Sequence, residues 1–110
     1  MDGLQAINEI NDLQKRLGDG IKIMGNLGRK WAEKERAYRV ALMQATLLEK
    51  DKGTPATLIG TIVKGTVANE KFARDEAEAL WKTAQENVNA LKIQIKVLDN
   101  QIGREWGNEQ

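Results

Sequence analysis

The sequence predicts an all-α fold: a long antiparallel helical hairpin with a short helix at its tip and an N-terminal helix, coiled-coil-like and oligomeric. Apolar residues recur every three or four positions over most of the chain, including an unbroken heptad stripe in the last third. The chain has one proline in 110 residues and no strand-like alternation. We therefore expect residues 1–110 to form a single helical domain, with helices at about 3–17, 21–51, 55–64 and 67–106.

The first helix is predicted over 3–17, and a second over 21–51. The first has an apolar stripe of Leu4, Ile7, Ile10, Leu13 and Leu17. Gly18-Asp19-Gly20 follows, and each glycine inside a helix costs roughly 1 kcal/mol relative to alanine, so the chain is expected to be interrupted or weakened there. One continuous helix remains an alternative, because the apolar period continues. The second stripe consists of Met24, Leu27, Trp31, Tyr38, Ala41, Ala45 and Leu48, with Lys34 in one apolar slot.

The clearest break between predicted helices is Asp51-Lys52-Gly53-Thr54-Pro55. Gly53 suits the left-handed position just after a helix end. Thr54 is expected to cap the next helix and Pro55 to occupy its first turn, where a missing N–H does no harm. This short helix, 55–64, should pack through Leu58, Ile59, Ile62 and Val63, and Gly65 should end it.

The last helix, 67–106, carries the strongest pattern in the chain. Its seam is Ala77, Trp81, Ala84, Val88, Leu91, Ile95, Leu98 and Ile102, with spacings of four and three residues in alternation. About 40 residues would extend about 60 Å, too long for the rest of one chain to cover. A second apolar strip, Ala90, Ile93 and Val97, lies off this seam. We therefore expect a partner copy and a homo-oligomer.

Composition excludes several classes of site. The chain has no cysteine and no histidine, so disulfides, thiolate catalysis and Cys/His zinc sites are impossible. The most common general acid–base residue near neutral pH is also absent. Carboxylate or lysine catalysis remains an alternative on composition, but we expect no enzymatic activity, no cofactor and no metal. No apolar run reaches the roughly 18 residues of a membrane helix, and the N-terminus does not resemble a signal peptide, so we expect a cytoplasmic protein with no membrane partner.

The net charge of +1 conceals an asymmetry along the chain. Residues 21–53 carry eight basic and four acidic groups, whereas residues 1–20 carry two and four. Charge complementarity between neighbouring helices is one explanation, and an anion-binding face is the other. Double-stranded DNA is not expected as a partner, because Lys64 is the only charged residue of the short helix and a recognition helix needs several polar side chains.

Three groups of residues are candidates for a ligand site. The first is the N-terminus of the short helix, where Thr57 and free backbone N–H groups could hold an anion. The second group combines aromatic and basic side chains: Arg29, Lys30, Trp31, Arg36, Tyr38 and Arg39. The third group follows the start of the last helix and would lie near Lys50 and Lys64 in a hairpin: Lys71, Phe72, Arg74 and Asp75.

Each group also has a purely structural interpretation. The first can be an ordinary capped helix. Trp31 and Tyr38 lie on the predicted seam and can be core residues. The third can be a solvated face with pairs such as Lys71 with Asp75. The predicted ligand-binding residues are Tyr38, Arg39, Thr57, Lys64, Lys71 and Arg74.

Several segments together resemble a family of small phage and prophage proteins of Gram-positive bacteria. The matching pieces, which span residues 27–106, are Leu27-Gly28-Arg29-Lys30-Trp31-Ala32-Glu33, Tyr38-Arg39-Val40-Ala41, Gly53-Thr54-Pro55-Ala56-Thr57-Leu58-Ile59, Phe72-Ala73-Arg74-Asp75, Leu91-Lys92-Ile93-Gln94, Gln101-Ile102 and Arg104-Glu105-Trp106. The resemblance implies a phage origin and a place in the cytoplasm of the bacterial host. By analogy of type, it places the chain beside phage counter-defence proteins that sequester host signalling nucleotides.

The leading hypothesis is a non-enzymatic homo-oligomer that binds a small anionic ligand, such as a host immune signalling nucleotide, as a counter-defence sponge. Arg and Lys would pair with phosphate, and Tyr or Trp would stack on the base. One alternative is a helical protein–protein interaction module that inhibits a host defence or recombination factor. A second is a single-strand nucleic-acid accessory protein, against which the near-zero net charge counts.

Overall fold

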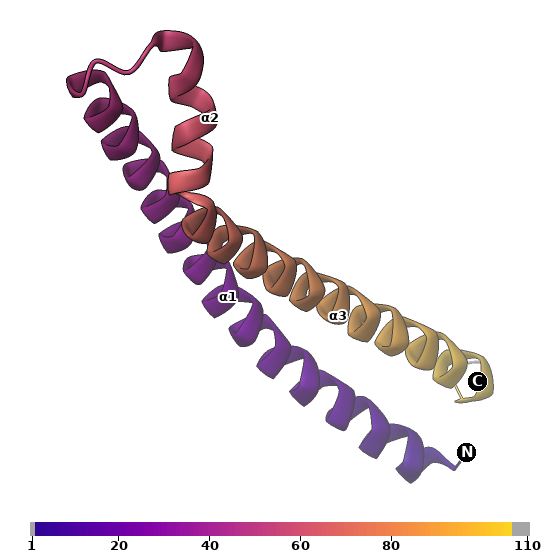
Figure 1. The fold of residues 1–110 in the computed structure, drawn as a ribbon. Helices are drawn as coiled ribbons and strands as arrows, with labels where there is room; N and C mark the ends of the chain where they lie inside the picture. Colours follow the sequence, from indigo (N-terminus) through magenta and orange to yellow (C-terminus); the bar gives the residue numbers. More distant parts are fainter. Residues whose placement is uncertain (1, 107–110) are drawn as a thin grey trace. The chain divides into compact units, whose positions relative to one another are not determined.

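The computed structural model describes residues 2–106, which form three helices and no strands. These are α1 (Gly3–Asp51), α2 (Ala56–Thr66) and α3 (Ala68–Trp106) (Figure 1). The predicted all-α class is confirmed, whereas the hairpin arrangement and the oligomeric state stay predictions. None of the helices in the described part of the chain is both long and apolar enough to span a bilayer.

Contacts divide the described residues into two compact units. The central unit is Leu27–Trp81. The terminal unit combines the described residues up to Asn26 with those from Lys82 onward. Each unit contains a segment of α1 and a segment of α3, and each is described by itself below. The single-domain organisation stays a prediction.

In the terminal unit, α1 continues through Gly18-Asp19-Gly20, where an interruption was expected. Gly20 lies on the packed face of α1: a Cβ placed on it would be 3.4 Å from Val88 Cγ2 and 3.8 Å from Leu91 Cδ1. Here the helix is stabilised by packing against α3, which offsets the intrinsic cost of the glycines. The continuous alternative is therefore the correct one.

The start of α1 packs differently from the predicted stripe. Leu4 and Ile7 are 69% and 57% exposed, while Ala6 is 1% exposed and Leu13 is 6% exposed. The prediction was wrong for the two larger residues because repeated steps of three residues drift around a helix of 3.6 residues per turn. An alternation of three and four, which includes Ala6 and Ile10, stays on one face. The helix begins with a reciprocal capping box, in which Gln5 N donates to Asp2 Oδ1 (2.7 Å) and Asp2 N donates to Gln5 Oε1 (3.2 Å).

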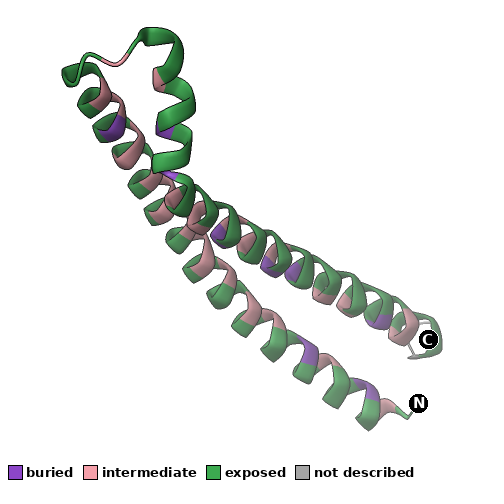
Figure 2. Ribbon diagram, in the orientation of Figure 1, coloured by how far each residue is buried: buried purple, intermediate pink, exposed green. Residues whose placement is uncertain are grey.

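The core of the central unit contains Ala45, Val63 and Val67, one from α1, one from α2 and one between α2 and α3. Figure 2 shows buried positions among half-buried and exposed ones along the helices. The α1 residues predicted for the seam here, from Leu27 to Ala45, are buried or half-buried, and Lys34 is half-buried in its apolar slot. Leu48 is 55% exposed, so the prediction was wrong for that residue. The apolar packed face ends at Ala45, six residues before α1 does.

The turn after α1 follows the predicted chemistry only in part. Gly53 has a φ of 78°, and Gly53 N donates to Lys50 O while Thr54 N donates to Glu49 O. This pair of bonds is the Schellman motif that a left-handed glycine permits. Thr54 does not cap α2, because its Oγ1 donates instead to Glu49 Oε2 at 2.7 Å. Pro55 occupies the N-cap of α2 without a side-chain hydrogen bond.

The junction between α2 and α3 is shorter than predicted. Gly65 does not end α2, which continues to Thr66. Val67 alone separates the helices, with φ −104° and ψ 17°, and it is 3% exposed. Burial of this valine fixes the junction more strongly than the glycine before it. Of the predicted apolar side of α2, Ile59 and Val63 pack against the core, whereas Leu58 and Ile62 are 52% and 40% exposed.

The heptad stripe of α3 is confirmed as its packed face. All eight seam residues are buried or half-buried, among them Ala77, Ala84, Val88 and Leu98 at 7% exposure or less. The second strip is exposed: Ile93 and Val97 are 63% and 57% accessible, and Ala90 is exposed as well. In the terminal unit, the seam therefore packs against α1 and the second strip does not.

Candidate functional site

A cluster of charged and aromatic side chains lies where α1 meets α3 in the central unit. The Arg74 guanidinium is 4.5 Å from the centroid of the Tyr38 ring, a cation–π contact. Arg74 Nη1 is 3.4 Å from Glu35 Oε2, and its Nη2 is 2.9 Å from Asp75 Oδ1. Arg39 Nε donates to the other Glu35 oxygen at 2.7 Å. Glu35 thus joins two arginines, and both guanidinium groups already have carboxylate partners.

These contacts shift two pKa values. The hydrogen bond from Arg39 holds the pKa of the Glu35 carboxyl below its ordinary value of 4.5, and the charges of Arg39 and Arg74 lower it further against desolvation. The pKa of Arg74 is raised, first by its hydrogen bond to Asp75 and then by the nearby acidic charges. Each guanidinium group of the cluster faces a carboxylate, so the positive charge of the cluster is largely balanced.

A hollow of about 330 Å³ lies beside this cluster, and we call it the central hollow. Its lining residues come from all three helices and the junction: Tyr38, Lys64, Val67, Ala68 and Lys71. Two lysines and a phenol therefore converge on a partly apolar floor. A concave apolar surface with a few polar groups is the usual form of a small-molecule site. Amines at its rim would favour an anion.

Four of the six predicted binding residues gather here. Tyr38, Lys64 and Lys71 line the central hollow, and Arg74 lies over the Tyr38 ring. The other two do not line it. The side chain of Arg39 is 72% exposed and paired with Glu35, and Thr57 is exposed in the first turn of α2.

Sequence reasoning missed the aromatic pair at the other end of the central unit. Trp31 and Trp81 stack with ring centroids 5.3 Å apart and planes inclined at 27°. Gly28 makes room for them: a Cβ at this position would lie 2.9 Å from Trp81 Nε1. Each tryptophan was placed on a seam, but their pairing required the register between α1 and α3, which no local pattern gives. Glu35 was missed for the same reason.

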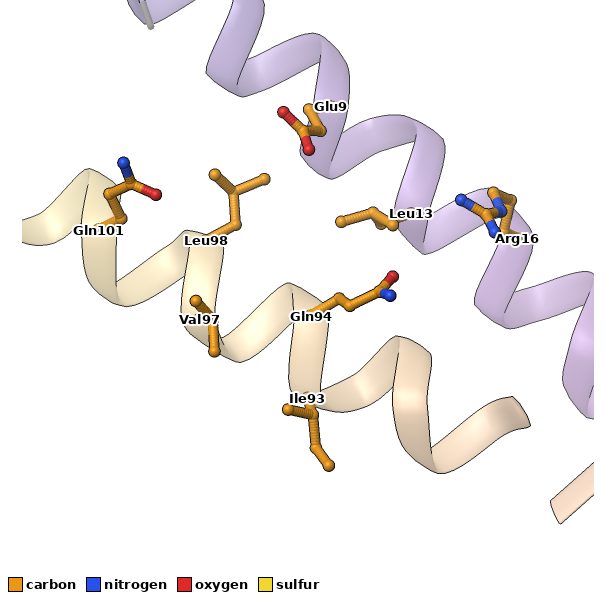
Figure 3. A pocket seen from close by; sticks show the side chains of 8 residues that line it. All are labelled: Glu9, Leu13, Arg16, Ile93, Gln94, Val97, Leu98 and Gln101. Carbon is orange, nitrogen blue, oxygen red and sulfur yellow. The ribbon is translucent and has the colours of Figure 1, made fainter. Parts of the chain in front are cut away.

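Two further hollows lie between α1 and α3 of the terminal unit, with volumes of about 450 and 520 Å³. Figure 3 shows the first, which Glu9, Leu13 and Arg16 line from α1 and Gln94 and Leu98 line from α3. Among the described residues, no group of three or more His, Cys, Asp or Glu side chains is placed to hold a metal ion. The polar chemistry of the described hollows therefore comes from amines, guanidinium groups, amides, carboxylates and one phenol.

No family model matches the chain, and neither the curated proteins nor the solved structures include a significant match.

Proposed function

We propose that the chain is a non-enzymatic, homo-oligomeric protein of phage origin that sequesters a small anionic ligand, specifically a host immune signalling nucleotide, in the cytoplasm of the bacterial host. The observation that carries the proposal is the convergence of Lys64 and Lys71 with Tyr38 on one hollow. The phage origin rests on the resemblance given above. A sponge needs affinity without bond cleavage, so it requires charge and shape but no general acid or base.

In this proposal the lysines, and not the arginines, bind phosphate. Arg74 is held by Glu35 and Asp75, and Arg39 by Glu35. Recruiting either guanidinium would break an existing ion pair. The ammonium groups of Lys64 and Lys71 carry flexible point charges that suit phosphate. Arg74 instead covers the Tyr38 ring, so a base would have to stack on another part of that ring.

The volume of the central hollow bears on how a ligand would sit. About 330 Å³ is near the lower end of the range for small-molecule sites. It would hold a phosphate and the adjoining sugar, with the rest of a nucleotide outside one chain. In the proposed oligomer, a second copy would cover that remainder.

Isothermal titration calorimetry with cyclic dinucleotides and cyclic ADP-ribose isomers tests the proposal. We expect one ligand to bind tightly and to be recovered intact after denaturation. Lys64→Ala and Lys71→Ala should each weaken binding by about tenfold, the loss of one charge-assisted contact. Lys22→Ala, an exposed lysine of the terminal unit, is the matched control. No heat with any nucleotide, or equal affinity in all variants, would overturn the proposal.

The alternative of a protein–protein interaction module has one specific observation in its favour. Leu58 and Ile62 lie one turn apart on α2 and are 52% and 40% exposed. Exposed apolar side chains on one helical face are typical of helix-mediated docking. Under this alternative, a host-lysate pull-down yields one stoichiometric protein, a Leu58→Ser/Ile62→Ser double variant loses it, and Lys64→Ala retains it.

A further inference from the structure

One face of α3 in the terminal unit is exposed along its length among the described residues. It consists of six exposed residues spaced alternately by four and three positions, which we call the outer strip: Glu86, Ala90, Ile93, Val97, Asn100 and Arg104. Such spacing keeps all six on one side of the helix. The seam residues that pack inside the unit, such as Val88, Leu91 and Leu98, belong to a different face. The outer strip is therefore a second heptad stripe without a helix against it.

The apolar centre of the outer strip is exposed. It also reaches the edges of the two hollows between α1 and α3: Ile93 and Val97 line that of about 450 Å³, and Ala90 lines that of about 520 Å³. Ile93 points away from α1 (Figure 3), and it is 63% exposed. Two large branched side chains at the centre of a helical stripe are suited to helix–helix packing.

The charges of the outer strip identify its partner as a second copy in the opposite direction. The strip is symmetric about position 95: Ile93 mirrors Val97, Ala90 mirrors Asn100, and acidic Glu86 mirrors basic Arg104. In an antiparallel pair, each residue meets its mirror position on the other chain, so opposite charges meet at both ends. In a parallel pair, Glu86 would face Glu86 and Arg104 would face Arg104, which is unfavourable.

We propose that the terminal unit forms an antiparallel, two-fold symmetric dimer through the outer strip, with Glu86 opposite the partner's Arg104 and Ile93 opposite the partner's Val97. The interface is isologous, which is the commonest form in soluble homo-oligomers. The inference rests on the homo-oligomeric part of the proposed function and is independent of its ligand.

Cysteine cross-linking tests the direction of the dimer without background, because the chain has no native cysteine. Ala90→Cys and Asn100→Cys chains are oxidised separately and after mixing by unfolding and refolding. In the antiparallel dimer, only the mixture forms cross-linked dimers. In the antiparallel dimer, the two identical cysteines of a single variant would lie about 15 Å apart along the helix axis, which is beyond the reach of a disulfide. A parallel dimer would instead cross-link each variant with itself, and either that result or the absence of cross-links in the mixture would overturn the inference.

Charge reversal tests the register. Glu86→Arg and Arg104→Glu should each weaken dimerisation by about tenfold or more, through two symmetric contacts per dimer. The double variant Glu86→Arg/Arg104→Glu should restore dimerisation, and Glu76→Arg, an exposed site in the central unit, should leave it unchanged.

Sedimentation equilibrium gives the dissociation constants of the dimers. A monomeric wild-type chain would contradict both this inference and the homo-oligomeric proposal. If the wild type is oligomeric and the charge-reversal variants associate as strongly as it does, only this inference is contradicted. Incorporation of a different host protein at the strip, with no self-association, would likewise overturn it.

Discussion

Tyr38 combines a packing role with a place at the candidate site. Its ring packs against the core of Ala45, Val63 and Val67, carries Arg74 at 4.5 Å and lines the central hollow. The sequence places Tyr38 on a seam and also among basic residues, and on the pattern alone these two interpretations are alternatives. The structure contains both arrangements, because an aromatic ring has enough surface to be buried at one edge and accessible at another.

Gly25 and Gly28 give a matched pair of predictions on α1. A Cβ at Gly25 meets nothing within 4 Å, whereas a Cβ at Gly28 would lie 2.9 Å from Trp81 Nε1. Gly25→Ala should stabilise the protein by about 1 kcal/mol through helix propensity. Gly28→Ala should destabilise it by about 1 kcal/mol, because displacement of the stacked tryptophan outweighs the same gain. Urea unfolding at one protein concentration measures both, and equal stabilisation would contradict the close approach.

Glu35 gives a prediction about pH. Its pKa is lowered in the folded state, chiefly by the hydrogen bond from Arg39. A lowered folded-state pKa contributes stability above the unfolded value of about 4.5, and this is lost as the pH falls through the folded-state pKa. Glu35→Gln should therefore be less stable than the wild type at pH 7 and equal to it in strong acid. The exposed Glu33→Gln variant is the control. A difference independent of pH would instead indicate a packing effect.

At the scale of elements, α2 is positioned by the junction that follows it. Its N-terminus has no side-chain cap, and Thr54 is engaged with Glu49. Val63 and Val67 are 2% and 3% exposed and lie on both sides of Gly65, which was expected to end the helix. A helix of 11 residues is marginal alone in water. Packing of these valines against α1 is therefore the main stabilisation of α2, and it also brings Lys64 to the central hollow.

Two neighbouring residues of α2 test this conclusion. Val63→Ala should destabilise the protein by about 2 kcal/mol, because it removes buried methyl groups from the core. Ile62→Ala, at a residue 40% exposed, should cost less than about 1 kcal/mol, since much of that side chain is already in water. Chemical denaturation followed by circular dichroism measures both. Equal effects would mean that α2 does not pack through Val63.

At the scale of the whole molecule, the described residues supply little buried apolar surface for the length of their helices. Only nine described hydrophobic residues are buried, and four of these are alanines. Fourteen large hydrophobic residues of the described part are exposed, including Ile93 and Val97. Helices with so few buried and so many exposed apolar residues gain stability when another chain covers the exposed ones.

Thermal stability should therefore depend on protein concentration. A hundredfold increase should raise Tm by about 5–10 °C if folding and association are linked. An Ile93→Gln/Val97→Gln variant should lose most of this dependence, whereas Leu58→Gln on α2 should retain it. Differential scanning calorimetry over a concentration series gives the values. A wild-type Tm that does not change with concentration would contradict linked association.

The sequence by itself determined the helical class, the α3 seam from Ala77 to Ile102 and the glycine turn at Gly53, because period and backbone conformation are local properties. It also selected Tyr38, Lys64, Lys71 and Arg74 as candidate residues from their chemistry. It did not determine that Gly20 continues a helix, that Trp31 stacks on Trp81, or that Glu35 neutralises Arg74. Only the tertiary structure decided these, because each depends on the register between helices distant in sequence. That register decided which charged side chains are already paired within the chain.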